Sequence, residues 1–116
     1  MALSRVKLFF DFSHSDLSAQ LAEWLDETMG QIRVTGVTMD SNQHGHCIAV
    51  LYQETPGPVY RAHVWFNWSH MALQQDVNEG LAAVEQAEGR FVALGSNDHG
   101  HCLCIIAEAE GMPEIG

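Results

Sequence analysis

The sequence predicts an α+β protein made of two similar halves, each with the order strand, helix, strand, strand. The chain resembles itself at offsets of 55 and 56 residues, and each half holds strand-length segments of alternating apolar residues around one segment of helical spacing. Of its 116 residues, 47% are hydrophobic and 17% are charged, which is typical of one folded domain. We therefore expect a single domain, residues 1–116, with repeats at about residues 4–54 and 59–109.

Two pairs of segments carry the internal repeat. Residues 5–14 (RVKLFFDFSH) align with residues 61–70 (RAHVWFNWSH), and residues 41–47 (SNQHGHC) align with residues 96–102 (SNDHGHC) with six identities in seven. A unit of about 55 residues is of marginal stability by itself. The two halves are therefore expected to share one core in a pseudo-two-fold arrangement.

The first half begins with a predicted strand whose apolar residues alternate: Val6, Leu8, Phe10 and Phe12. A helix follows, in which Ser13 and Asp16 fit a capping box. Its apolar stripe comprises Leu17, Leu21, Trp24, Leu25 and Met29. Strands over residues 32–39 and 46–53 complete the half, and the segment Ser-Asn-x-His-Gly between them is typical of a hairpin turn.

The second half repeats this order. Its first strand alternates Ala62, Val64, Phe66 and Trp68, its helix carries the stripe Leu73, Val77, Leu81 and Val84, and its last strands are expected at residues 91–94 and 101–107. A tandem strand-helix-strand-strand repeat predicts a two-layer sandwich of ferredoxin-like type.

The predicted sheets are apolar on both faces. In the first strand of each half, Phe9 and Trp65 are expected on the other face of the sheet from the alternating apolar residues. Residues 47–51 place apolar side chains on both faces of the sheet. One helix per half covers only one face, so the other must meet a second sheet, the opposite half or another subunit. We expect a homo-oligomer, most simply a dimer.

Charge and composition exclude several classes of partner. Five Lys and Arg against fifteen Asp and Glu leave a net charge of −10, which repels nucleic acid and anionic membrane surfaces but suits a basic protein partner. The sequence shows neither an apolar run of membrane-spanning length nor a signal peptide. Three cysteines do not make a disulfide framework. We expect a soluble, cytoplasmic protein.

Histidines are the main candidate functional residues. Six of the seven obey the repeat: His14, His44 and His46 in the first half, and His70, His99 and His101 in the second. In a strand-helix-strand-strand unit the first two strands run parallel, so the loop after the first strand and the later hairpin lie at the same edge of the sheet. The sequence therefore predicts one cluster of three imidazoles in each half.

Three neutral imidazoles with an open position suit zinc, nickel, copper or iron. Cys47 and Cys102 follow the clusters and would add a soft ligand. Adjacent side chains of a regular strand point to opposite faces, however, so His46 and Cys47 are not expected to share one ion. Small buried hydrophobic residues are the alternative interpretation of the cysteines.

A small anionic molecule is the alternative ligand for the same residues. Helix starts at Ser13 and Ser69 offer free N–H groups, and Asn42 and Asn97 add amide groups beside the imidazoles. A protein that senses or sequesters a phosphate- or carboxylate-bearing ligand would have these features. Histidine acid–base catalysis on a small anionic substrate and inhibition of a basic protein remain open as further alternatives.

Parts of each half resemble the C-terminal sensing domain of nickel-responsive repressors, which has an ACT-like fold. In that family a Tyr-Asp-His strand precedes an amphipathic helix, and a His-rich strand pair ends in a Cys before an apolar strand. The likeness is carried by residues 10–14 (FDFSH), the helix over residues 15–29, residues 44–51 (HGHCIAVL) and, more weakly, residues 101–106 (HCLCII).

The resemblance implies an ACT-like fold and the sensing of a small ligand or metal. It does not transfer the nickel site, because the family's two strand ligands fall on Met39 and Ser41 in the first half. Cys47 and Cys102 alone match ligand positions, and no DNA-binding region is present in the sequence. Fold likeness leaves the function to be argued from the site.

Overall fold

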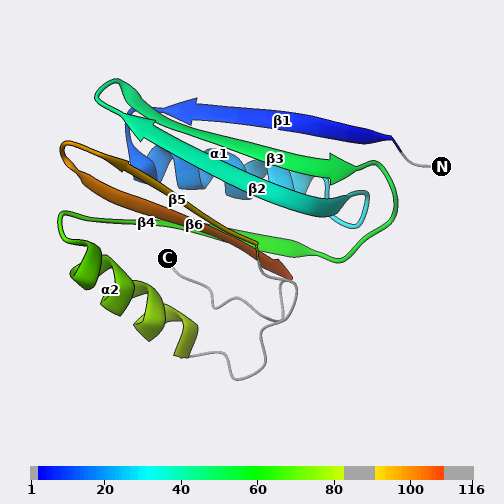
Figure 1. Cartoon of the computed structure of the whole chain (residues 1–116). Helices are drawn as coiled ribbons and strands as arrows, with labels where there is room; N and C mark the ends of the chain where they lie inside the picture. The colour runs from blue at the N-terminus through cyan, green and yellow to red at the C-terminus, as the bar shows by residue number, and fades with distance from the viewer. Residues whose placement is uncertain (1–2, 83–90, 109–116) are drawn as a thin grey trace.

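We describe a computed structural model of the chain, covering residues 3–82 and 91–108 (Figure 1). Each half has the order strand, helix, strand, strand, so the predicted α+β class is confirmed. The elements are β1 (Ser4–Asp11), α1 (His14–Glu27), β2 (Arg33–Asn42), β3 (Gly45–Gln53), β4 (Tyr60–Asn67), α2 (His70–Ala82), β5 (Phe91–Asn97) and β6 (Gly100–Glu108).

Two antiparallel sheets of three strands form the frame. Sheet A has the order β1-β3-β2 and sheet B the order β4-β6-β5, so the last strand of each half is central. Strands β1 and β2 each pair antiparallel with β3 and therefore run parallel to each other, as expected. The turns of the two hairpins are shorter than the sequence predicted, because the strands before them extend as far as Asn42 and Asn97.

Both helices begin at a serine cap. The Ser13 hydroxyl accepts a hydrogen bond from the Asp16 backbone N–H at 3.3 Å, and the Ser69 hydroxyl accepts one from the Ala72 N–H at 3.4 Å. Such caps satisfy an N–H group that has no partner within the helix. The apolar stripe of α1 is buried at Leu17, Leu21 and Leu25, whereas Met29 lies beyond the helix and is exposed. The predicted stripe residue Val84 lies outside the described residues.

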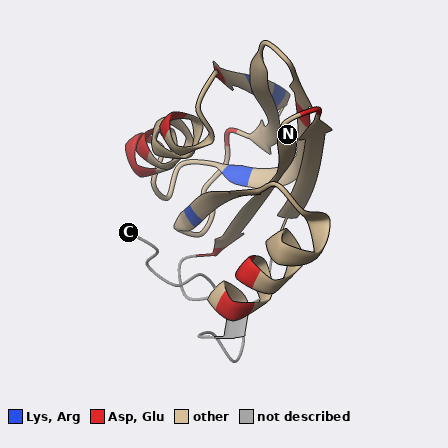
Figure 2. Cartoon of the chain, turned by 90° about the vertical axis from the view of Figure 1, so that its left-hand side faces the viewer, with Lys and Arg blue, Asp and Glu red and all other residues tan. Residues whose placement is uncertain are grey.

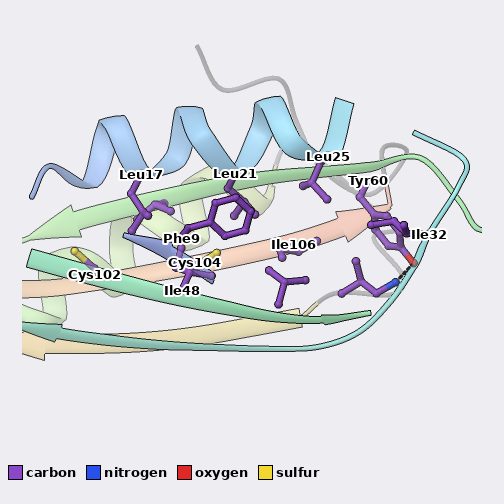
Figure 3. Packing of buried hydrophobic residues seen from close by; sticks show 13 residues of the cluster. Phe9, Leu17, Leu21, Leu25, Ile32, Ile48, Tyr60, Cys102, Cys104 and Ile106 are labelled. Atoms are coloured by element: carbon purple, nitrogen blue, oxygen red, sulfur yellow. Dashed lines mark hydrogen bonds between the residues drawn. The ribbon is translucent and has the colours of Figure 1, made fainter. Parts of the chain in front are cut away.

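The main core joins the two halves. Leucines of α1 point into the space between the sheets, where they meet Phe9 and Ile48 of sheet A and Ile106 of sheet B (Figure 3). Helix α1 also lies directly against β4, and the Ser18 hydroxyl accepts a hydrogen bond from the Val64 N–H at 3.2 Å. The first helix therefore packs on strands of both halves.

A second, smaller core lies on the other face of sheet B. Leu73 and Val77 of α2 cover Ile105 and Ala107, so β6 is buried on both faces. The helices consequently lie on different sides of the molecule (Figure 2). The main core uses the helix-covered face of sheet A but the face of sheet B that α2 leaves free. Because these faces are not equivalent in the repeat, the halves do not pack in the pseudo-two-fold arrangement that we expected.

Strands β2 and β5 meet where the two sheets adjoin. A Cβ atom added to Gly95 would lie 2.6 Å from the Ser41 hydroxyl and 3.1 Å from the Ser41 backbone nitrogen. At the ends of the strands, the Asn97 side-chain amide donates to the Asn42 carbonyl oxygen at 3.0 Å. This contact sets both hairpins side by side. Neither described helix has the length and apolar character needed to cross a membrane.

Candidate functional site

The histidine-bearing loops gather at one end of the molecule, at the left in Figure 1. Strand β1 leads into α1 there, and the β2–β3 and β5–β6 hairpins lie next to each other. The two predicted histidine clusters therefore lie at the same end of the fold.

Part of the repeated motif builds the hairpin turns. The side-chain oxygen of Asn42 accepts the His44 N–H at 2.7 Å, and that of Asn97 accepts the His99 N–H at 2.8 Å. Gly45 has φ +148°, and a Cβ atom there would lie 2.8 Å from the Asp11 carbonyl oxygen. These positions are typical of Asx turns with a glycine in a conformation that other residues rarely adopt.

The second histidine of each motif is held by a serine across the strand pair. Ser41 and His46 are partners in the sheet register, and the Ser41 hydroxyl lies 2.8 Å from His46 Nδ1. Ser96 and His101 repeat the pair at 2.7 Å. Both pairs have a structural role in cross-linking the hairpin strands. The first histidine of each motif, His44 or His99, lies at the turn. Its side chain is exposed and takes no part in the Ser–His pairs.

The first histidine cluster and part of the second share a hollow of about 290 Å³. The start of α1 and both hairpins contribute to it, and the Phe66 ring stacks on the His14 ring with centroids 5.2 Å apart and an interplanar angle of 20°. We call this cavity the histidine hollow. Its lining residues are Phe12, Ser13, His14, Asn42, Gln43, His44, Gly45, His46, Phe66, Asn97 and His99.

Burial shapes the protonation of two of its imidazoles. It lowers the pKa of His14. It also lowers the pKa of His46, to which the nearby His14 adds in the same direction while the Asp11 carboxylate opposes it. Desolvation favours the neutral ring. These two imidazoles are therefore held toward the neutral form, which both donates and accepts hydrogen bonds.

Cys102 of the second half touches His46 of the first. Its sulfur lies 3.6 Å from His46 Nδ1 and 3.9 Å from Nε2. Burial raises the pKa of the Cys102 thiol to about 11, although a hydrogen bond with Ser41 acts against this, and burial raises the pKa of Cys104 to about 12. Protonated thiols are weak nucleophiles and weak ligands. Both cysteines serve the core as small apolar groups, whereas Cys47 is exposed on the opposite face from His46.

The second predicted cluster is divided. His99 lines the histidine hollow, but His70 and His101 lie outside its lining, and their rings are 6.1 Å apart. Of the predicted ligand-binding residues, Ser13, Asn42 and Asn97 line the hollow, whereas Ser69 serves as the cap of α2. Within residues 3–82 and 91–108, no group of three or more His, Cys, Asp or Glu side chains is arranged to hold a metal ion.

Sequence reasoning missed several residues of this region. Phe12, Phe66 and Gln43 line the hollow, and Cys102 contacts His46. The sequence could have indicated Phe66, because it continues the alternating apolar series of its strand and lies next to the end of β4, where the histidine-bearing loops begin. His63, which has no counterpart in the repeat, shares a groove of about 480 Å³ between α1 and β4 with His14; burial lowers its pKa, and His14 lowers it further.

Comparisons with known proteins do not supply a function for this site. No protein-family model, curated protein or solved structure matches the chain. The function is therefore argued from the geometry of the histidine hollow.

Proposed function

We propose that the protein binds a small anionic organic molecule in the histidine hollow, in the manner of a sensing or sequestering protein. The observation that carries the proposal is the convergence of four imidazoles from both halves on one cavity, at the start of a helix: His14, His44, His46 and His99.

The polar groups of the hollow favour the binding of an anion. Imidazole and amide groups supply hydrogen-bond donors, and the N-terminus of a 14-residue helix adds free N–H groups and the positive end of its dipole. Although the chain carries a net charge of −10, none of the described residues lining the hollow is acidic. An anion in the hollow would therefore meet no carboxylate in the lining itself.

The volume and aromatic lining of the hollow favour a small, flat molecule as the ligand. A volume of about 290 Å³ is near the lower limit of cavities that hold organic ligands. The stacked rings of His14 and Phe66, together with the Phe12 ring, give the hollow an aromatic lining. An aromatic or unsaturated carboxylate would place its charge near the helix start and its plane against these rings.

Calorimetric titration of the full chain with benzoate, and separately with inorganic phosphate, tests the proposal. We expect benzoate to bind and His44→Ala to weaken its binding by about tenfold, as for the loss of one hydrogen bond to a charged group. The matched control is His70→Ala, an exposed histidine at a helix start outside the hollow. Equal weakening by both variants, or no binding of either anion, would contradict the proposal.

Transition metals form a second arm of this experiment. The imidazoles of the hollow would need to move closer together to hold zinc, nickel, copper or iron, since no described group has metal-binding geometry. Binding of Zn²⁺ or Ni²⁺ that His44→Ala abolishes, together with failure of both anions to bind, would assign the hollow to a metal. An interaction with a basic protein would persist in the His44→Ala variant.

We also infer that the halves descend from one duplicated unit of ferredoxin-like type in a cytoplasmic protein. Both halves share the strand order, the serine cap, the Asx turn and the cross-strand Ser–His pair. The three free cysteines, two of them buried, are compatible with a reducing compartment.

A further inference from the structure

One face of sheet A is apolar and bare. Side chains of β1 and β3 pair across this face in the rows Val6–Leu51, Leu8–Ala49 and Phe10–Cys47. Val6 is 58% exposed, Leu8 71%, Phe10 47% and Leu51 40%. We call these six residues the open face. Contiguous apolar groups at such exposure are typical of interaction surfaces.

The internal repeat shows that the equivalent face of the other sheet is buried. Sheet B carries Val64 at the position of Leu8, Cys104 at that of Ala49 and Ile106 at that of Leu51. Val64 is 2% exposed, and Cys104 and Ile106 are fully buried, because α1 and sheet A cover them. The same type of surface is therefore core in one half and open in the other.

Helix α2 of another copy is poorly suited to cover the open face in the way that α1 covers sheet B. Helix α1 approaches β4 closely because its outer side carries small residues, Ser18, Ala19 and Ala22. At the corresponding positions α2 carries Gln74, Gln75 and Asn78, whose longer polar side chains would lose water against apolar strands. A head-to-tail chain of molecules is thus disfavoured.

The open face is also low in charge. Its third strand, β2, contributes Gly36 and Thr38 to the same rows. The charged residues of β2 on this side lie at its two ends, Asp40 beside Cys47 and Arg33 beside Gln53. Six of the acidic residues lie on α1 and α2, where Figure 2 marks them in red, and not on the strands of the open face. A second copy can therefore approach this face with little local repulsion despite a net charge of −10 on each chain.

We infer that the protein forms a homodimer in which the open faces of two copies pack against each other around a two-fold axis. Sheets packed in this way lie about 10 Å apart and interdigitate their apolar side chains. The interface is isologous, so it closes after two copies. It ends at the histidine hollow, since the Phe12 ring lines the hollow and packs edge-on against Phe10 with centroids 5.3 Å apart.

Sedimentation of the full chain tests this inference. We expect the wild-type protein to be a dimer at about 100 µM, and Leu8→Asp to weaken association by at least about a hundredfold, because it places a carboxylate in the apolar centre. Leu94→Asp is the matched control: Leu94 lies on β5, away from the open face, and is 59% exposed. A monomeric wild-type protein, a larger or open-ended assembly, or dissociation by Leu94→Asp would each overturn the proposed dimer.

The thiol of Cys47 provides a second measurement that needs no variant. It lies exposed on the open face, whereas Cys102 and Cys104 are buried. In the dimer its reaction with a maleimide is expected to be slow, and to accelerate by at least about tenfold when the protein is diluted into the monomer range. A rate that does not depend on protein concentration would contradict the interface, even if Leu8→Asp does not fold. A failure of benzoate to bind would leave both measurements unaffected.

Discussion

Gly95→Ala tests the contact between the sheets that sets the two hairpins side by side. The added methyl group would lie 2.6 Å from the Ser41 hydroxyl, 3.1 Å from the Ser41 nitrogen and 3.2 Å from the Asp40 carbonyl carbon. The hydroxyl cannot simply rotate away, because it lies 2.8 Å from His46 Nδ1. Strand β5 must therefore move from β2. Overpacking of this kind costs about 1–3 kcal/mol.

The matched control is Gly36→Ala, in the corresponding strand of the first half. A Cβ atom there would meet only the Leu51 Cβ atom at 3.8 Å, an ordinary contact. Replacing a strand glycine without strain stabilises by about 0.5–1 kcal/mol. We therefore expect Gly95→Ala to lower the free energy of unfolding by about 1–2 kcal/mol, and Gly36→Ala to leave it unchanged or raise it.

Denaturant unfolding followed by tryptophan fluorescence measures both variants. For a chain of this size, a loss of about 2 kcal/mol corresponds to a fall in Tm of roughly 8 °C. Equal stability of the two variants would refute the close approach of β2 and β5. Gly95→Ala is also expected to weaken benzoate binding, because the Asn42 and Asn97 turns that border the histidine hollow would move apart.

Three further predictions concern buried polar groups. Burial lowers the pKa of three histidines in the folded state, so the unfolded chain binds more protons than the folded chain at acidic pH. The free energy of unfolding should therefore fall as pH drops below about 6.5. Denaturation at several pH values measures this, and a flat profile would contradict it. These residues are His14, His46 and His63. Ser41→Ala should lower the free energy of unfolding by about 1–3 kcal/mol, because it removes the hydrogen-bond partner of the buried His46. Ser96→Ala, which removes the partner of His101 in the exposed equivalent pair, should change the free energy of unfolding little. Similar losses of stability in both variants, measured by chemical denaturation, would contradict this prediction. Tyr60→Phe should lower stability by about 1–3 kcal/mol in the same assay, because the Val34 N–H donates to the Tyr60 hydroxyl at 3.0 Å, and an unchanged midpoint would exclude this bond.

Local features could be read from the sequence because neighbouring residues determine them. The spacing of Leu17, Leu21 and Leu25 predicted the buried side of α1, and Ser13 marked its first turn. The alternation in residues 6–10 predicted a strand with two distinct faces, and the repeated Asn and Gly predicted the hairpins. Each of these depends on backbone geometry over a few residues.

The sequence by itself therefore determined the element order, the α+β class, and the convergence of His14, His44 and His46 on one end of the sheet. Only the tertiary structure decided that α1 packs on β4, that His99 joins the first cluster, and that His70 stays outside. The physical reason is that both faces of each sheet are apolar, so local patterning did not distinguish which face of sheet B would be buried against the first half. Long-range packing made that choice, and it placed the two copies of one motif in different surroundings.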